Sequence, residues 1–270
     1  NTTGASNFSS ALFFESSVNI GVHGGTIIGQ MSGVGSAASW NSVNEKINGV
    51  VFRAGSKNVE IDNLQMQAIR GWPIWASGID GSGTLADGLW VHHSSATGGE
   101  TSIAIVAGQN LLIEDSSFSD ATYYAIDFEP DGPTGHIRHT LIQRNTFDRW
   151  GWRGMGSTYY FVAFTLGYSG PPFADMLDLI VRDNLVIRGD VVTSRGGLRT
   201  IGDRANPKVD IVVTGNISQV PRTDPGGGMN FANVNNLRVT GNTQTNTNHV
   251  PLVDQDSNPS GIHVLVPNNT

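Results

Sequence analysis

A short phrase recurs eight times along the chain and limits the folds open to it more than any other feature. Each copy alternates apolar residues, then adds a polar pair, a small residue or Asn, and another apolar position, as in "NLLIEDSSF" (110–118). The fourth residue of each copy defines eight anchor positions: Val22, Ile61, Val91, Ile113, Ile142, Val181, Val213 and Val239. Self-similarity of this kind indicates a solenoid, in which each repeat stacks on the one before it.

The intervals between anchors vary from 22 to 39 residues, and this unevenness also fits a solenoid. Stacked strands must keep their positions, whereas the loops that join them are free to differ in length. A second apolar stretch lies between the phrases, for example "TSIAIVA" (101–107) and "YYFVAFTL" (159–166), so each coil carries at least two strands. We therefore expect about eight to ten coils, and eight coils stacked at ~4.8 Å would form a rod of roughly 35–40 Å.

The composition agrees with a folded, strand-rich chain. The 34 glycines and the abundant Asn, Ser, Thr and Asp favour turns over helix interiors. Hydrophobic residues at 38% and charged residues at only 14% are enough to build a core. The net charge of −7, from 16 basic and 23 acidic residues, argues against a nucleic-acid partner. No stretch approaches the ~20 apolar residues of a membrane span, so membrane insertion is not expected.

Asparagine fills the same place in four successive phrases, at Asn145, Asn184, Asn216 and Asn242. Asn tolerates the left-handed backbone conformation of a tight turn, and aligned amides can hydrogen-bond from one coil to the next. The column therefore predicts the register of the coils. An antiparallel sandwich also has many short strands, but it explains neither this column nor the unequal loops.

The phrases, together with the opening "SSALFFESSVNIGVHGGTIIG" (9–29), resemble the parallel β-helix repeats of the pectate-lyase-like superfamily. The resemblance implies an all-β, single-chain, right-handed parallel β-helix forming one domain over residues 1–270. Superfamily members usually carry an amphipathic N-terminal cap and further coils, so one interpretation is that residues 1–270 are a fragment of a longer chain. Polysaccharide lyases, glycoside hydrolases, C5-epimerases, tailspikes and adhesins share the fold, which leaves the activity open.

The stretch "YAIDFEPDG" (124–132) holds the candidate chemistry. Alternation along a strand places the two apolar residues of "IDF" in the core. Asp127 and Glu129 then face outward on the same side, ~7 Å apart, and the turn that follows brings Asp131 back toward them. The coils on either side present small or neutral residues, so the enzyme hypothesis predicts a groove at this place.

Three interpretations of this acidic cluster stay open. The first is a solvated strand face, which any β-helix must have. The second is a Ca²⁺ site at Asp127, Glu129 and Asp131, because clustered carboxylates suit calcium; no cofactor is otherwise expected to be required. The third is acid/base catalysis on a sugar. Hydrolysis uses two carboxylates flanking the glycosidic bond, whereas lyases and epimerases use a base beside a uronate carboxyl, with positive charge to neutralise it.

The same stretch partly matches the "Tyr-Gly-Phe-Asp-Pro-His" signature of mannuronan C5-epimerases. By that resemblance Tyr124 and Asp127 would be catalytic. The match is incomplete, because two residues intervene before the proline and no histidine follows directly. The nearest histidines, His136 and His139, are interpreted as substrate-binding residues.

Basic and aromatic residues follow in "DRWGWRGMG" (148–156), inside one of the two longest intervals between anchors. Long loops on a rigid scaffold often carry function. Trp150 and Trp152 are suited to stack on sugar faces, and Arg149 or Arg153 to bind a carboxylate. Arg153 is assigned to the catalytic group and the other three to substrate binding. The alternative is that the aromatic residues only pack the loop against the coil.

Two further polar features lie outside this loop. Arg199 in "RGGLRTIGDR" (195–204) is a substrate-binding candidate, although a surface network of Arg and Asp explains the same residues. The adjacent histidines His92 and His93 are a candidate metal site, because imidazole is a common metal ligand. Adjacent strand residues point to opposite faces, so they do not readily chelate one ion, and we predict no metal there.

These observations lead to a polysaccharide-active β-helix protein of lyase, glycoside hydrolase or C5-epimerase type, acting on a glycan bound along an outer face. The alternative is a non-catalytic glycan-recognition or structural module, such as a phage tailspike or adhesin rod. We expect an extracellular or virion location, a polysaccharide partner, and a homotrimer or larger assembly if the chain belongs to a tailspike.

Overall fold

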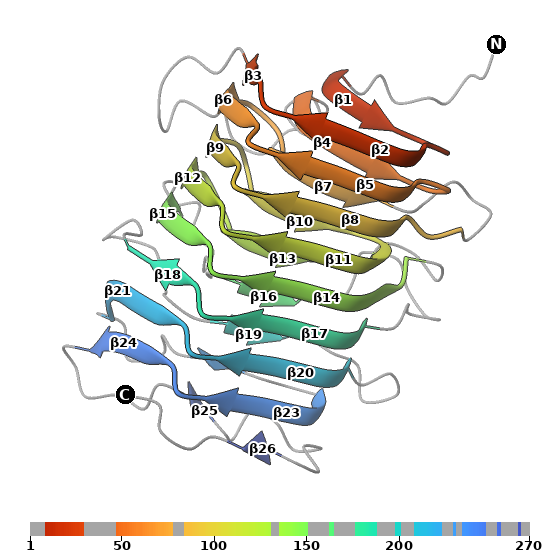
Figure 1. Cartoon of the computed structure of the whole chain (residues 1–270). Helices are drawn as coiled ribbons and strands as arrows, with labels where there is room; N and C mark the ends of the chain where they lie inside the picture. Colours follow the sequence, from red (N-terminus) through yellow and green to blue (C-terminus); the bar gives the residue numbers. More distant parts are fainter. Residues whose placement is uncertain are drawn as a thin grey trace.

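The computed structural model shows a right-handed coil of 26 β-strands stacked along one axis (Figure 1). It describes residues 9–29, 47–77, 84–130, 135–150, 162–164, 176–187, 198–200, 208–222, 229–230, 234–246, 253–254 and 264–265. Every strand pairing within these ranges is parallel, which excludes the antiparallel sandwich. None of these residues is helical, so no described helix is long and apolar enough to cross a membrane.

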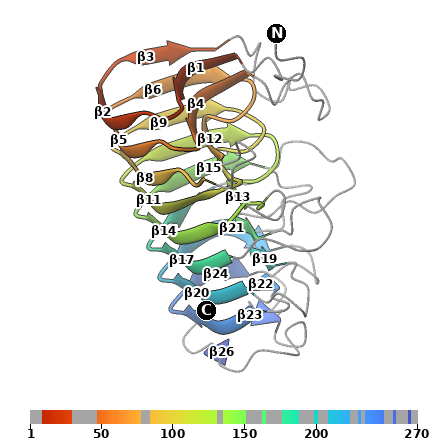
Figure 2. The same ribbon diagram turned by 90° about the vertical axis from the view of Figure 1, so that its right-hand side faces the viewer.

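The strands form three sheets, and each coil contributes one strand to each of them in turn (Figure 2). Sheet A has nine strands: Ser9–Phe14 (β1), Ile47–Arg53 (β4), Ile74–Ser77 (β7), Ile103–Ile105 (β10), Ile126–Phe128 (β13), Val162–Phe164 (β16), Leu198–Thr200 (β19), Met229–Asn230 (β22) and Val253–Asp254 (β25). Sheet B has nine: Val18–His23 (β2), Lys57–Asp62 (β5), Asp87–His92 (β8), Gly108–Glu114 (β11), Ile137–Gln143 (β14), Met176–Arg182 (β17), Lys208–Thr214 (β20), Val234–Thr240 (β23) and Val264–Leu265 (β26). Sheet C has eight: Thr26–Ile28 (β3), Gln65–Ile69 (β6), Ser95–Gly98 (β9), Ser117–Ala121 (β12), Thr146–Trp150 (β15), Leu185–Val186 (β18), Ile217–Arg222 (β21) and Thr243–Asn246 (β24).

The eight anchors stand opposite one another in a single column of sheet B, as the sequence repeat predicts. All of them except Val22 are fully buried, because alternation turns this position toward the centre of the coil. Sheet C adds a second inward column that includes Phe118 and Phe147, whose rings stack with centroids 5.3 Å apart. The apolar positions of three sheets thus close one continuous core along the axis.

In eight coils, the residue directly after the sheet B strand is left-handed, and it leads the chain into sheet C. The residues with positive φ at this turn are Gly24, Asn63, His93, Asp115, Arg144, Asp183, Gly215 and Gly241. Left-handed backbone is costly for residues other than Gly, Asn and Asp, which explains why those types fill six of the eight positions. The sequence prediction assigned this conformation to the asparagine column, and that was wrong, because the left-handed residue is the one before each asparagine.

The asparagine column itself is confirmed as a hydrogen-bonded ladder. Asn145, Asn184 and Asn216 each donate from Nδ2 to Oδ1 of the asparagine in the next coil, at 2.9–3.2 Å. Each amide also donates to a backbone carbonyl of the preceding coil, and all four asparagines of the column are buried. Ser94 and Ser116 continue the column toward the N-terminus through bonds from backbone N to Oγ. The ladder fixes the coil register across intervals that vary from 26 to 39 residues between anchors.

Candidate functional site

The acidic strand lies on the outer face of sheet A. In β13, Ile126 and Phe128 are fully buried in the core, and Asp127 between them points outward and is half-buried. This is the orientation that alternation predicts. Glu129 follows the end of the strand, is also half-buried, and is held by its backbone N, which donates to Ile105 O at 2.9 Å.

Asp127 belongs to a column of outward positions that runs across successive coils of sheet A. In register order this outer column is Val51, Trp75, Ala104, Asp127 and Ala163. The neighbours of Asp127 are therefore both alanines, as predicted. Arg199 follows Ala163 in the same register, two strands beyond Asp127. The column thus brings an aromatic residue, an acid and an arginine position into one line.

The end of the outer column before Asp127 is apolar. Val51, Trp75 and Ala104 form a cluster separate from the core, and Trp72 and Val106 pack against it. Trp75 is only 7% exposed, whereas Trp72 is half-buried, and their ring centroids lie 4.8 Å apart at a tilt of 57°. Trp72 therefore presents part of its ring to the outside, with Trp75 packed behind it.

The carboxyl groups of Asp127 and Glu129 share a hydrogen bond. The pKa of Asp127 is raised well above its ordinary range, chiefly by burial, and further by the charge of Glu129 and the hydrogen bond to it. Asp127 Oδ1 is buried and has no hydrogen-bond partner within the part of the chain that the structure describes. The pair therefore holds a proton at a pH where exposed carboxylates have lost theirs.

This contact limits the chemistry that the pair can perform. Glycosidases place their two carboxyl groups about 5–9.5 Å apart, so that a glycosidic bond fits between them. The carboxyl groups of Asp127 and Glu129 instead lie within hydrogen-bonding reach of each other. The geometry suits one proton donor beside one acceptor, both offered to the same ligand group.

The other residues expected near this acid pair are distributed around the coil. Tyr124 lies just before β13 and is half-buried, and its carbonyl accepts a hydrogen bond from Ser102 N at 3.4 Å. His136 precedes β14 at the start of a sheet B strand. Asp131, Trp152 and Arg153, which include the third carboxylate of the Ca²⁺ hypothesis and the proposed catalytic arginine, lie outside the described residues.

The structure places Trp150 and Arg149 on sheet C, a different sheet from the acid pair. Trp150 is 1% exposed and packs in the core of sheet C, because the strand β15 continues through it where the sequence suggested a loop. Arg149 donates two hydrogen bonds to the carboxylate of Asp120, from Nε at 2.5 Å and from Nη2 at 2.7 Å. Trp150 is therefore covered in this structure, and the guanidinium of Arg149 is engaged by Asp120.

His139 also lies away from the acid pair, on sheet B. It has a φ of 50° in a second left-handed column that includes Asn110 and Asp178. Its Nδ1 lies 3.1 Å from Asp178 Oδ2, the next residue in that column. This pairing resembles the amide contacts elsewhere in the column, such as that between Asn58 and Asn19 at 3.0 Å.

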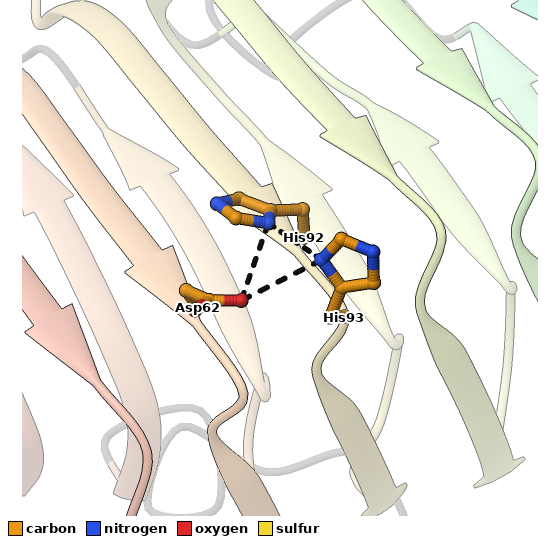
Figure 3. A group of neighbouring side chains, drawn as sticks. All are labelled: Asp62, His92 and His93. Atoms are coloured by element: carbon orange, nitrogen blue, oxygen red, sulfur yellow. Dashed lines mark hydrogen bonds and ion pairs between the residues drawn. The ribbon is translucent and has the colours of Figure 1, made fainter.

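The expectation that His92 and His93 diverge is wrong. His92 ends β8, but His93 is the left-handed residue of the turn, with a φ of 48°. The turn swings the second imidazole back toward the first, so that their Nδ1 atoms lie 2.8 Å apart (Figure 3). The alternation rule applies only within a strand, and β8 ends at His92, so the rule does not apply to His93.

The most useful residues that the sequence prediction missed are Trp72 and Trp75. They occur in "WPIWAS" (72–77), which is the second apolar stretch of its coil. Aligning this segment with "AIDFE" by the anchors places Trp75 and Asp127 in one column, so the signal was present in the sequence. What it could not show is that Trp75 is covered while Trp72 is partly open.

Taken together, the sheets and their register define a parallel β-helix protein with a polar and aromatic strip on one outer face. Its structure is similar to that of PfbA, a surface adhesin of Streptococcus pneumoniae, with a TM-score of 0.51 and 14% sequence identity. The match covers 84% of this chain and 64% of the PfbA chain, so this chain spans somewhat less than two thirds of that protein. No known family and no curated protein sequence matches the chain, so the likeness concerns the fold alone.

Proposed function

We propose that the chain is an extracellular or virion-borne recognition rod that binds a glycan across the outer face of sheet A. The observation that carries this proposal is the outer column, which sets the Trp72–Trp75 pair and the Asp127–Glu129 pair on one face, two coils apart. Saccharides are bound by aromatic rings that stack on their apolar faces and by polar groups that pair with hydroxyls. The outer column offers both.

The order of residues along the column supports a ligand lying along the rod axis. Trp75 and Asp127 are separated by the single residue Ala104, so the distance between their strands is ~10 Å. The protonated carboxyl of Asp127 can donate to a hydroxyl while Glu129 accepts, which gives the site directional contacts without a net positive charge.

PfbA, which has a similar fold, is a surface adhesin, so recognition is a role that such a rod can carry. A glycan panel tests it directly, with the wild type, Trp72→Ala and Trp90→Ala compared on every glycan that binds. Trp90 is 39% exposed on sheet B and is the matched control for removal of a surface tryptophan. We expect Trp72→Ala to weaken binding tenfold or more and Trp90→Ala to leave it unchanged. Equal losses in both variants, or binding by neither the wild type nor the variants, would contradict the proposal.

A second candidate function is acid catalysis on the bound glycan, and the raised pKa of Asp127 favours it. A carboxyl that keeps its proton to a higher pH than an ordinary aspartic acid has a property that a general acid needs. Reducing ends and the ultraviolet absorbance of unsaturated products should be followed with and without Ca²⁺, for the wild type and Asp127→Asn. Turnover that requires Asp127 would establish an enzyme, and binding without any turnover would leave recognition alone.

Assembly is a separate part of the proposal. If the rod belongs to a tailspike, three copies associate side by side, and we propose a homotrimer for that case. The molar mass in solution, measured by light scattering, distinguishes a trimer from a monomer. A glycan that bound only to the trimer would place the site between copies instead of on the outer face of sheet A.

A further inference from the structure

We propose that Asp62, His92 and His93 form a binding site for a divalent transition-metal ion of the Zn²⁺ type. The three residues come from two adjacent coils, at the turn between sheets B and C, and their donor atoms converge on one point (Figure 3). The site is independent of the glycan-binding proposal, because it lies on a different sheet from the outer column.

The distances between the donor atoms suit a metal of this size. His92 Nδ1 lies 2.8 Å from His93 Nδ1 and 3.2 Å from Asp62 Oδ1, and His93 Nδ1 lies 3.5 Å from the same oxygen. A triangle with these three sides has a circumradius of about 1.9 Å. An ion slightly above its plane therefore sits ~2.0 Å from each atom, which is the usual Zn–N and Zn–O distance.

The fold brings the three donors together by two separate means. Asp62 and His92 are register partners at the ends of β5 and β8, so strand pairing places them side by side. His93 joins them through the left-handed conformation that this turn has in all eight of these coils, which directs its imidazole toward His92 and Asp62.

Surrounding side chains orient the donors as the outer shell of a metal site does. Glu60 Oε1 lies 3.1 Å from His92 Nε2, an arrangement that keeps the proton on Nε2 and the lone pair on Nδ1 facing the site. Asn63 Nδ2 donates to Asp62 Oδ2 at 2.8 Å, which leaves Oδ1 turned toward the histidines. The indole of Trp90 stacks on the His92 ring with centroids 4.0 Å apart.

One of the three ligand atoms is buried and has no hydrogen-bond partner among the described residues. Asp62 Oδ1 is buried, and neither imidazole donates a well-aligned hydrogen bond to it. His92 is 7% exposed, so its ring is held in place, whereas the His93 side chain is 61% exposed. The site is therefore closed on the side of the coil and open on the side of His93, where a water or another ligand can complete the coordination.

The donor set selects the class of ion. Two imidazoles and one carboxylate suit Zn²⁺ and its neighbours in the first transition row, whereas Ca²⁺ and Mg²⁺ prefer oxygen ligands throughout. Three protein ligands with an open position are typical of sites that bind water or an exchangeable ligand, rather than of four-ligand structural zinc. His23, on the preceding coil, has its Nδ1 3.8 Å from Asp62 Oδ2 and so also lies close to the site.

The experiment uses tag-free protein, since a histidine tag would bind the same ions. Zn²⁺ uptake is measured by dialysis and elemental analysis and by calorimetric titration with zinc chloride. Co²⁺ replaces Zn²⁺ in a parallel titration, because its visible absorption reports tetrahedral nitrogen and oxygen ligands. The variants are His92→Gln, His93→Asn and Asp62→Asn. His139→Asn is the matched control, because it removes a left-handed histidine that pairs with a single carboxylate.

We expect one Zn²⁺ per wild-type chain, a rise in melting temperature with added Zn²⁺, and at least tenfold weaker binding in each of the three variants. His139→Asn should bind like the wild type. His93→Asn is the variant least disturbing to the fold, because Asn accepts the left-handed turn. Absence of stoichiometric uptake by the wild type, or uptake that His93→Asn leaves unchanged in a folded protein, would overturn the proposal.

Discussion

The amide of Asn184 donates to Asn216 Oδ1 at 3.0 Å inside the coil, and its own Oδ1 accepts hydrogen bonds from the backbone N and side chain of Asn145. One buried side chain thus links three successive coils. A hydrogen bond in the interior contributes little by itself, but the loss of one partner leaves others buried and unsatisfied. The ladder is therefore more sensitive to single substitutions than an apolar column of the same size.

The first prediction concerns this ladder. Asn184→Ala should lower the free energy of unfolding by about 3 kcal/mol, because it leaves buried donors and acceptors in both neighbouring coils without partners. Equilibrium unfolding in urea measures the change. Asn58→Gly is the control, since Asn58 makes a similar contact with Asn19 but is exposed. A loss at Asn184 no larger than at Asn58 would show that the ladder does not stabilise the coil.

The second prediction concerns pH. The pKa of Asp127 is raised in the folded state, so the folded protein binds its proton more tightly than the unfolded chain. Asp127 therefore contributes stability at low pH that is lost as the pH rises above about 4, near the ordinary pKa of 3.8. Asp127→Asn lacks this loss, so the variant should gain stability relative to the wild type with increasing pH.

Urea unfolding at a series of pH values from acid to neutral tests this sign. Asp183→Asn, at an exposed turn position, serves as the control for a carboxylate-to-amide change. If the difference between Asp127→Asn and the wild type were constant across the series, or if it shrank as the pH rose, Asp127 would not be the buried, protonated member of the pair.

The third prediction separates two roles for Trp150. Because its side chain is fully buried in the core, Trp150→Ala should reduce the free energy of unfolding by about 3–5 kcal/mol. Glycan binding, measured where the variant remains folded, should stay at the wild-type level. Trp150→Phe, which keeps an aromatic ring in the core, should recover part of the stability. A specific loss of glycan affinity with unchanged stability would restore the sugar-stacking interpretation.

The fourth prediction concerns the turn between sheets B and C. Gly24 and Gly215 both have positive φ there, of 69° and 66°. Alanine at either position should cost roughly 1–2 kcal/mol, since an L side chain disfavours this conformation. A Cβ at Gly24 would meet no atom within 4 Å, whereas one at Gly215 would contact Asp183 Oδ1. Any excess cost at Gly215, measured by thermal unfolding, should disappear in the double variant with Asp183→Gly.

The fold followed from the sequence because its strongest signals are local and periodic. The anchors pair with one another in the structure exactly one coil apart, even across loops of very different length, since strand stacking permits no slippage where one face is buried. The asparagine column was predictable for the same reason. What periodicity did not reveal was the residue that makes each turn, because left-handed geometry is available to several residue types.

The candidate site was only partly predictable. Alternation correctly turned Asp127 outward between two alanines, because a strand has a strict period of two. Alternation gives no information about where a strand ends. Trp150 was therefore assigned to a loop although β15 includes it, and His93 was assigned to the opposite face although β8 ends before it. The contact between Asp127 and Glu129 depends on side-chain rotamers, and the backbone spacing alone could not supply it.

Stacking by nearest neighbours has a consequence for how such a chain can change its length. Each described strand pairs only with the strand one coil before and the strand one coil after it. Removal or duplication of one whole coil, from one anchor to the next, would keep every remaining pair matched, whereas loss of a single residue within a strand would turn the following side chains to the opposite face. The coil is therefore the unit by which this protein can be shortened or extended, and the surface of the rod can be lengthened without redesigning its interior.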